Sequence, residues 1–255
     1  MLDPVVVIIV QARMSSSRLP GKVLLPIAGK PMLQHVLYRV RQSRRKNLVV
    51  VATTTEENDT GIVDLCRLLK VDFFRGPVDD VLHRYASAAD HFGADIIVRV
   101  TADCPLIDPG VVDDTIETFT SGDFDYLSTE YGHKTYPHGL AVEVFSREAL
   151  VRADKEADKS FEREHVTPYI HNHPERFKLG GIHLPEDFSF IRVTVDEPED
   201  ISVVEGVLEL NPKIDVKGLI DLWQKHPDLF RANQSVGERW LRNRDRMFRE
   251  GIDDL

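Results

Sequence analysis

The chain has 255 residues and a formal net charge of −10, from 32 basic and 42 acidic side chains. Its 42% hydrophobic and 29% charged residues are typical of a folded globular protein and exclude a chain that is disordered throughout. The length predicts one large domain or one domain with an appendage. The acidic excess argues against a protein that wraps a nucleic-acid backbone, so we expect no nucleic-acid partner.

The charge is distributed unevenly along the chain. Residues 1–50 hold nine Lys or Arg and one acidic residue, Asp3, whereas the remaining residues are strongly acidic. A basic segment on an acidic body predicts a local site for an anion. The first apolar run, Val5 to Val10, is too short for a membrane span or a signal peptide, and an acid precedes it. We therefore expect a cytoplasmic protein with no membrane partner. The two cysteines, Cys66 and Cys104, form no CxxC pair and no disulfide framework.

The first half of the chain alternates between strands and helices. Short apolar runs predict four strands, at residues 5–10, 48–53, 71–74 and 95–100. Apolar residues at helical spacing predict a helix after each strand, at residues 31–40, 59–69, 81–89 and 111–119. Short connections between them predict an α/β fold in which helices cover both faces of a mostly parallel sheet.

The second half is more mixed. Further strands are predicted at residues 125–128, 140–145, 177–183 and 188–195. Further helices are predicted at residues 146–157, 161–172, 200–210 and 216–223. No repeat or low-complexity linker is visible, so we predict a single domain over 1–255, with an inserted region at about 125–185 and a helical, arginine-rich tail at 235–255.

The loop after the first strand is the most informative segment. Residues 11–22 read QARMSSSRLPGK and hold three cations, Arg13, Arg18 and Lys22, among small residues. Ligands of open α/β sheets bind outside the carboxyl ends of the strands. Arg can bind two phosphate oxygens at once and Lys acts as a point charge, so the loop could hold a triphosphate. It could also be an ordinary solvated loop, since it matches neither GxxxxGK[ST] nor GxGxxG.

Two aspartates each follow a predicted strand. Asp103 comes after 95–100, and Asp196 comes after 188–195. Two carboxylates at strand ends can hold Mg²⁺ and leave its other positions to phosphate and water. Either one alone is more typical of a turn or a helix cap. Glu197, Glu199 and Asp200 are interpreted as capping residues of the next helix.

The segment QARMSSSRLPGKVLLPIAGKPMLQHVL closely resembles the opening of the cytidylyltransferases that activate acidic sugars, such as the acylneuraminate and 3-deoxy-manno-octulosonate enzymes. The resemblance continues, in order, through RGPVDDVLHRY, VRVTADCPLIDP, PHGLAVEVFSREAL, REHVTPYI and RVTVDEPED, over about residues 5–205. The branch it resembles most is the spore-coat polysaccharide biosynthesis type. The resemblance implies a Rossmann-like (GT-A-like) nucleotidyltransferase fold, CTP as donor, an acidic sugar as acceptor, Mg²⁺ dependence and a homodimer. The inserted region would then carry sugar-binding and dimer contacts.

The resemblance also implies roles for individual residues. Catalytic roles fall on Arg13, Lys22 and Asp103, and metal binding falls on Asp103 and Asp196. Nucleotide binding is expected from residues of three segments: Gln11, Ala12, Arg13, Ser15, Arg18, Lys22, Arg75 and Asp80. Sugar binding is expected from His138, Glu143, Arg163 and His165. Asp80 could equally cap the helix that follows it, and the histidines could be ordinary surface residues.

Two positions depart from the family pattern. Ser15 stands where relatives commonly have Gly, and Thr101-Ala102-Asp103 stands where several have Gln-Gly-Asp. Thr101 cannot reach as far as a Gln amide, so the identity of the sugar is left open. Two other functions also stay open. One is a different nucleotide-sugar enzyme of the same fold, either a sugar-1-phosphate nucleotidyltransferase or a glycosyltransferase, and the other is a non-catalytic nucleotide-binding partner.

Overall fold

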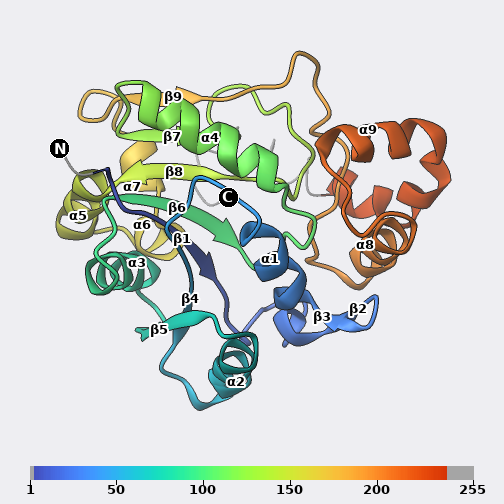
Figure 1. Cartoon of the computed structure of the whole chain (residues 1–255), viewed down its shortest axis with the longest axis horizontal. Helices are drawn as coiled ribbons and strands as arrows, with labels where there is room; N and C mark the ends of the chain where they lie inside the picture. The colour runs from blue at the N-terminus through green and yellow to red at the C-terminus, as the bar shows by residue number, and fades with distance from the viewer. Residues whose placement is uncertain (1–2, 240–255) are drawn as a thin grey trace.

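A seven-stranded sheet runs through the protein in the computed structural model, which describes residues 3–239 (Figure 1). The strands lie in the order β5-β4-β1-β6-β8-β7-β9, and β8 runs opposite to the others. Their bounds are β1 Val6–Gln11, β4 Leu48–Thr54, β5 Asp72–Gly76, β6 Ile96–Thr101, β7 Tyr126–Ser128, β8 Glu143–Ser146 and β9 Leu179–Gly181. A small hairpin, β2 (Pro26–Ile27) with β3 (Lys30–Pro31), stands apart from the sheet.

Helices cover both faces of the sheet (Figure 1). The α-helices are α1 Met32–Val40, α2 Thr60–Leu69, α3 Val81–His91, α4 Pro109–Ser121, α5 Arg147–Glu156, α6 Ser160–His165, α7 Pro168–His171, α8 Pro198–Leu210 and α9 Val216–Lys225. Short 3₁₀ turns are η1 Lys22–Leu24, η2 Glu57–Asp59 and η3 Pro227–Asn233. This arrangement confirms the predicted α/β class with a mostly parallel sheet. No helix within residues 3–239 is long and apolar enough to cross a membrane.

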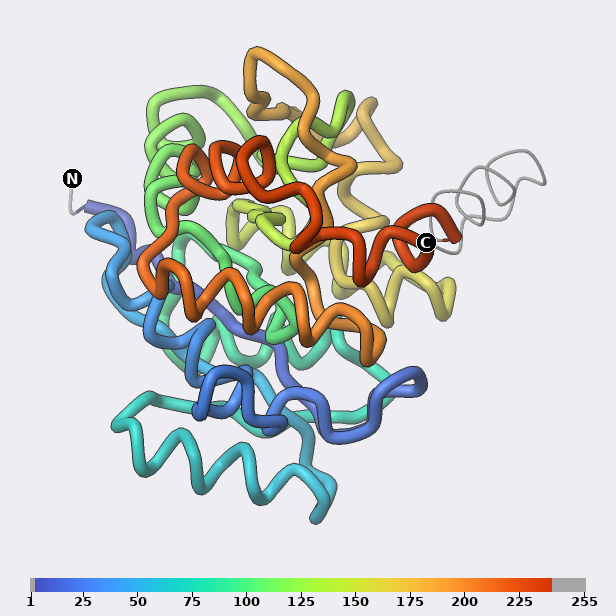
Figure 2. The backbone as a smooth tube through the Cα atoms, turned by 90° about the vertical axis from the view of Figure 1, so that its right-hand side faces the viewer, coloured from blue at the N-terminus to red at the C-terminus, as the bar shows by residue number. Residues whose placement is uncertain are grey.

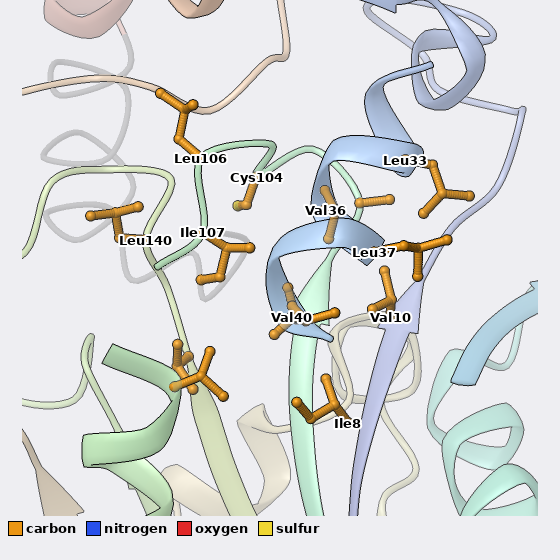
Figure 3. Close-up of a cluster of buried hydrophobic side chains, with 14 of the residues drawn as sticks. Ile8, Val10, Leu33, Val36, Leu37, Val40, Cys104, Leu106, Ile107 and Leu140 are labelled. Carbon is orange, nitrogen blue, oxygen red and sulfur yellow. The ribbon is translucent and has the colours of Figure 1, made fainter. Parts of the chain in front are cut away.

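Strand β1 lies at the centre of the sheet and is buried on both faces. Ile8 and Val10 point to the face covered by α1 (Figure 3), and Val7 and Ile9 point to the face covered by α3. Burial on both sides explains the uninterrupted apolar run in the sequence. Each fully buried aliphatic side chain contributes about 1.5–3 kcal/mol, so this strand is a rigid base for the loop that follows it.

One predicted strand is wrong. Residues 188–195 form no strand, and their strand-type pairing is limited, among the described residues, to an isolated bridge between His138 and Arg192. Residues 191–195 are nevertheless buried, and the segment bonds to loops: the His138 N–H donates to the Ile191 carbonyl (2.8 Å), and the Val195 N–H donates to the Asp103 carbonyl (2.9 Å). A buried loop therefore produced the apolar alternation of a strand.

Other predicted elements need smaller corrections. The predicted helix at 161–172 is two helices, α6 and α7, because Val166 has a positive φ of 74° and Pro168 begins the second one. The region predicted as an insertion at about 125–185 contributes β7, β8 and β9 to the main sheet, and its role as a separate substrate or dimerisation region stays a prediction. Of the predicted tail at 235–255, residues 235–239 are helical and the rest lies outside the described residues.

Helix α8 packs beside the amino-terminal part of the chain. Figure 2 shows α8, in orange, beside the blue segment that carries β2 and β3. The Ala28 N–H donates to Glu205 of α8 (2.8 Å). The segment immediately before α8, which ends at Glu197, is thereby brought close to the loop that follows β1.

Candidate active site

The loop after β1 is fastened to the neighbouring strand at two points. The Ala12 N–H donates to the Ala52 carbonyl (3.1 Å), and the Met14 N–H donates to Asp59 Oδ1 (2.8 Å). The other oxygen of Asp59 accepts from the Thr53 hydroxyl (2.9 Å) and from both the N–H and the hydroxyl of Thr54. This buried carboxylate holds the start of the loop at the end of β4.

Lys22 is the centre of the site. Its ammonium donates to Asp103 Oδ2, Asp196 Oδ1 and the Val195 carbonyl, each at 2.9 Å. Lys22 is buried, with 8% of its surface exposed. Burial acts to lower the pKa of Lys22, but the two carboxylates outweigh it and raise the pKa above its ordinary value. The lysine therefore stays charged at neutral pH, and it draws both predicted metal-binding aspartates together.

Asp196 is surrounded by cations. Oδ1 accepts from Lys22 and forms an ion pair with Arg18 (2.9 Å), and Oδ2 accepts from Arg192 (3.0 Å). Burial acts to raise the pKa of Asp196, yet Lys22, Arg18 and Arg192 bring it down to about 2. The carboxylate is therefore ionised at physiological pH. Three positive groups occupy the space around it in which a divalent cation would be attracted.

Arg192 and Asp200 support Asp196 from behind. Arg192 donates to both oxygens of Asp200 (2.8 Å each), and Asp200 also accepts from the backbone N–H of Asp196 and Glu197. Asn233 of η3 completes the cluster with a hydrogen bond to Asp200 (2.9 Å). Asp200 belongs to a capping box at the start of α8, as the sequence predicted, and it also neutralises a buried arginine.

A cavity of about 500 Å³ opens beside this cluster. Asp103, Asp196 and Arg18 line one end of it, and it extends along β6, β7 and β8 toward α6 and α7. Its remaining wall is formed mainly by tyrosine, histidine, threonine and glutamate side chains, and Ala141, Phe161 and Pro168 add apolar surface. The polar side chains of this wall include Thr101, Tyr126, Glu130, Tyr131, His138, Glu143, His165, Thr167 and His171.

Three of the four predicted sugar-binding residues line this cavity: His138, Glu143 and His165. The Glu143 carboxylate accepts from Arg99, from the Tyr126 hydroxyl (2.8 Å) and from the Thr167 hydroxyl (2.6 Å). Burial acts to raise the pKa of Glu143, but Arg99 and the two hydroxyls lower it. Burial also lowers the pKa of His138, so its imidazole is neutral at pH 7.

His138 reaches the cavity because its neighbour is a glycine. Gly139 has φ +114°, and a Cβ at this position would lie 2.5 Å from the Thr194 backbone nitrogen. Any larger residue would push this loop away from the segment that ends at Asp196. The glycine thus joins the cavity wall to the aspartate cluster.

Other predicted residues are engaged elsewhere. Arg163 does not line the cavity: it binds both oxygens of Asp80 (3.0 and 2.5 Å) and Asp154 (2.7 Å). Asp80 caps α3 by accepting from the His83 N–H (2.9 Å), which is the helix-capping role that the sequence left open for it. Arg75 donates to two backbone carbonyls at the end of β4.

The remaining loop residues differ in exposure. Arg13 is half-buried and forms an ion pair with Glu164 (3.4 Å). Ser15 is exposed at the tip of the loop, and Gln11 ends β1. Of the predicted residues, the structure brings Arg18, Lys22, Asp103 and Asp196 into direct contact.

Three residues of the site were not among those predicted from the sequence: Arg99, Arg192 and Asp59, which was predicted only as a helix cap. Arg99 and Arg192 each lie in a predicted strand, where a long cation beside apolar residues indicates a buried ionic partner. That signal was available. Asp59 could be interpreted only as a cap, because its bonds to Met14 depend on a contact across 45 residues.

A family model described as cytidylyltransferase matches residues 7–235. The chain belongs to the cytidylyltransferase family. It is 32% identical over 235 residues to the spore coat polysaccharide biosynthesis protein SpsF of Bacillus subtilis. The match covers 88% of this chain and 95% of that protein. It is 41% identical over 110 residues, 42% of each chain, to the 3-deoxy-manno-octulosonate cytidylyltransferase of Geobacter sulfurreducens.

A solved cytidylyltransferase from Leptospira borgpetersenii superposes with a TM-score of 0.86 at 32% identity, covering 89% of this chain and 97% of that one. The family and branch that the sequence resembled are thus confirmed. This cytidylyltransferase is a CTP-dependent nucleotidyltransferase, and its cluster of Lys22, Asp103 and Asp196 lies at the sheet edge where such folds bind ligands.

Proposed function

We propose that this cytidylyltransferase transfers CMP from CTP to the anomeric hydroxyl of an acidic sugar for surface polysaccharide or glycan biosynthesis. One observation carries the proposal: the Lys22 ammonium joins Asp103 and Asp196, and both aspartates line a cavity of about 500 Å³, large enough for a sugar. The partial match to a 3-deoxy-manno-octulosonate enzyme supports the choice of acceptor.

In the proposed reaction, the sugar oxygen forms a bond to the α-phosphorus of CTP, the bond to the β-phosphate oxygen breaks, and pyrophosphate leaves. Arg13, Arg18 and Lys22 would hold the triphosphate, because guanidinium and ammonium groups neutralise its oxygens. Stabilisation of charge that develops on the phosphate is the principal contribution to such transfers.

The residues present fit Mg²⁺. Asp103 and Asp196 converge on one ammonium at 2.9 Å each, so their oxygens already face a common positive centre. Mg²⁺ needs one or two carboxylates and takes its other ligands from phosphate and water, so the absence of a third acidic or histidine ligand within residues 3–239 does not oppose it. Bound there, Mg²⁺ would supply Lewis-acid stabilisation of the phosphate charge.

The cavity would take the sugar. His138, a neutral imidazole, can exchange hydrogen bonds with hydroxyls, and Arg18 lines the cavity beside Asp196, where it would meet the sugar carboxylate. Glu143 would orient Arg99 and the two hydroxyls rather than bind the sugar through a free carboxylate. We also propose that the protein is a homodimer and that it acts in the cytoplasm.

A pyrophosphate-release assay tests the proposal. The protein is incubated with Mg²⁺, each of the four nucleoside triphosphates and a panel of sugar acids, each sugar paired with its methyl ester. CTP-specific release that requires the free acid supports the proposal. Release with UTP or dTTP and a sugar phosphate would instead indicate a sugar-1-phosphate nucleotidyltransferase.

A further inference from the structure

Arg84 of α3 is buried without a hydrogen-bond partner. Its exposed fraction is 0%, and none of its three guanidinium nitrogens meets an acceptor among the described residues. Arg39 of α1 provides a contrast: it is also buried, but it donates to the backbone carbonyls of Ile107, Pro212 and Ile214. A guanidinium stays protonated in proteins, so Arg84 cannot escape the cost of burial by losing its charge.

The position of Arg84 is set by close packing at the end of β5. A Cβ added to Gly76, the last residue of β5, would lie 2.9 Å from Arg84 Cγ and 3.2 Å from Arg84 Cβ. The glycine therefore gives the arginine side chain room to pass. Besides the adjacent Tyr85, the groups that act electrostatically on the guanidinium are Arg13, Asp59 and Asp80. These residues follow β1, β4 and β5, so Arg84 lies where three neighbouring parallel strands end.

Neither carboxylate in this neighbourhood is available to Arg84. Asp59 accepts from the Met14 N–H and from Thr53 and Thr54. Asp80 accepts from the His83 N–H and from the guanidinium of Arg163. Arg13 adds a second positive charge nearby, which repels Arg84. The surroundings thus lack an acceptor for a cation that needs several.

We propose that Arg84 is a nucleotide-recognition residue, and that its guanidinium donates to an oxygen of the bound nucleotide. The inference rests on the proposed use of this sheet edge for CTP. Since Arg84 has no exposed surface, the residues that cover it must shift when the nucleotide binds. An oxygen acceptor that then arrives between the loop after β1 and the start of α3 would satisfy Arg84, and an anionic one would also relieve its repulsion with Arg13. The acceptor is either a phosphate oxygen or a carbonyl or hydroxyl oxygen of the nucleoside, and these sources can be separated by experiment.

The test compares Arg84→Met with Arg39→Met by calorimetric titration and thermal unfolding. Arg84→Met is expected to unfold at the same or a higher temperature than the wild type, because it removes an unpaired buried charge, and to bind CTP at least tenfold more weakly. Arg39→Met is expected to unfold at a lower temperature, because it leaves three buried carbonyls without a donor, and to bind CTP with unchanged affinity.

Titrations with cytidine, CMP, CTP and pyrophosphate identify the oxygen. An equal loss for cytidine and CTP assigns the contact to the nucleoside, and a loss confined to the phosphate-bearing ligands assigns it to a phosphate. Affinities of Arg84→Met within twofold of the wild type for all four ligands would overturn the inference while leaving the proposed function intact. If the wild type binds no CTP, the proposed function itself fails.

A measurement on the wild type covers the case in which Arg84→Met does not fold. The Nε–Hε resonance of Arg84 is assigned by its absence from an Arg84→Lys spectrum, and CTP is then added to the ¹⁵N-labelled wild-type protein. The resonance is expected to shift on saturation with CTP. An unmoved resonance at saturating CTP contradicts a contact with the nucleotide.

Discussion

The ammonium nitrogen of Lys22 and the carboxylate oxygen Oδ1 of Asp196 lie 2.9 Å apart, although 174 residues separate them in the chain. The contact joins the loop after β1 to the segment before α8. Asp103, at the end of β6, meets the same ammonium. The lysine occupies the position between two carboxylates that a metal ion would also favour, so the two cations would compete for it.

Replacing Lys22 by Met tests this competition. Without the ammonium, Asp103 and Asp196 repel each other, and Mg²⁺ should bind the nucleotide-free protein several-fold more tightly than it binds the wild type. Turnover should fall by about 10²–10³, because a donor to the developing phosphate charge is lost. The melting temperature is measured over a series of Mg²⁺ concentrations. An unchanged Mg²⁺ dependence would contradict the competition.

Asp200→Asn tests the support behind Asp196. The variant removes the charge partner of a buried arginine, Arg192, so the free energy of unfolding should fall by about 3 kcal/mol. The matched control is Asp64→Asn, which breaks an exposed ion pair with Arg67 and should cost less than about 1 kcal/mol. Urea unfolding measures both. Equal losses in the free energy of unfolding would show that the buried ion pair contributes no more to stability than the exposed one.

Asp59→Asn connects stability to pH. Burial acts to raise the pKa of Asp59, but its hydrogen bonds from Thr54, Met14 and Thr53 lower it below the ordinary value of 3.8. A carboxylate with a lowered folded-state pKa stabilises the fold above its unfolded pKa, and this stabilisation is lost as the pH falls. The variant should therefore be less stable than the wild type at pH 7, by about 1–3 kcal/mol, and the difference should shrink below about pH 4. Urea midpoints between pH 7 and pH 3 check this. A difference that stays constant over that range is the contrary outcome.

Glu143→Gln tests whether Glu143 affects binding of the sugar rather than binding of CTP. The neutral amide can no longer pair with Arg99, although it keeps the shape of the side chain. The KM for the sugar should rise about tenfold, since a charged hydrogen bond is worth about 1.5–3 kcal/mol, and the KM for CTP should stay the same. Steady-state kinetics with each substrate varied in turn provide the measurement. A rise confined to the KM for CTP would assign Glu143 to the other half of the site.

Much of the fold could be predicted from the sequence because β1, β4 and β6 are buried on both faces, which produces apolar runs with clear ends. The segment 188–195 misled the prediction for a physical reason. A buried loop and a strand both alternate apolar and polar residues, and only the hydrogen-bond partners distinguish them. The break between α6 and α7 at Val166 could not be predicted either, because a positive φ at a valine depends on its tertiary surroundings.

The candidate site was predictable where its residues follow strands or share one loop. Lys22, Asp103 and Asp196 were named on that basis, and the structure places them together. Arg163 and Asp80 were also named as ligand-binding residues; in the structure they bind each other, and their ligand roles stay predictions. Arg84 gave no signal in the sequence, since an arginine in an amphipathic helix is usually solvated, and its burial depends on a glycine at the end of a neighbouring strand.

The most direct test of the central claim is the rate of pyrophosphate release from CTP by Asp103→Asn, measured with the best sugar acid and saturating Mg²⁺. Asp113→Asn serves as the control, because it makes the same chemical change away from the cluster. Asp113 of α4 accepts hydrogen bonds from the Ser43 hydroxyl and the Arg44 backbone N–H. We predict that Asp103→Asn folds normally and loses at least about 10²-fold in rate, while Asp113→Asn keeps the wild-type rate. A rate for Asp103→Asn within threefold of the wild type would contradict the account.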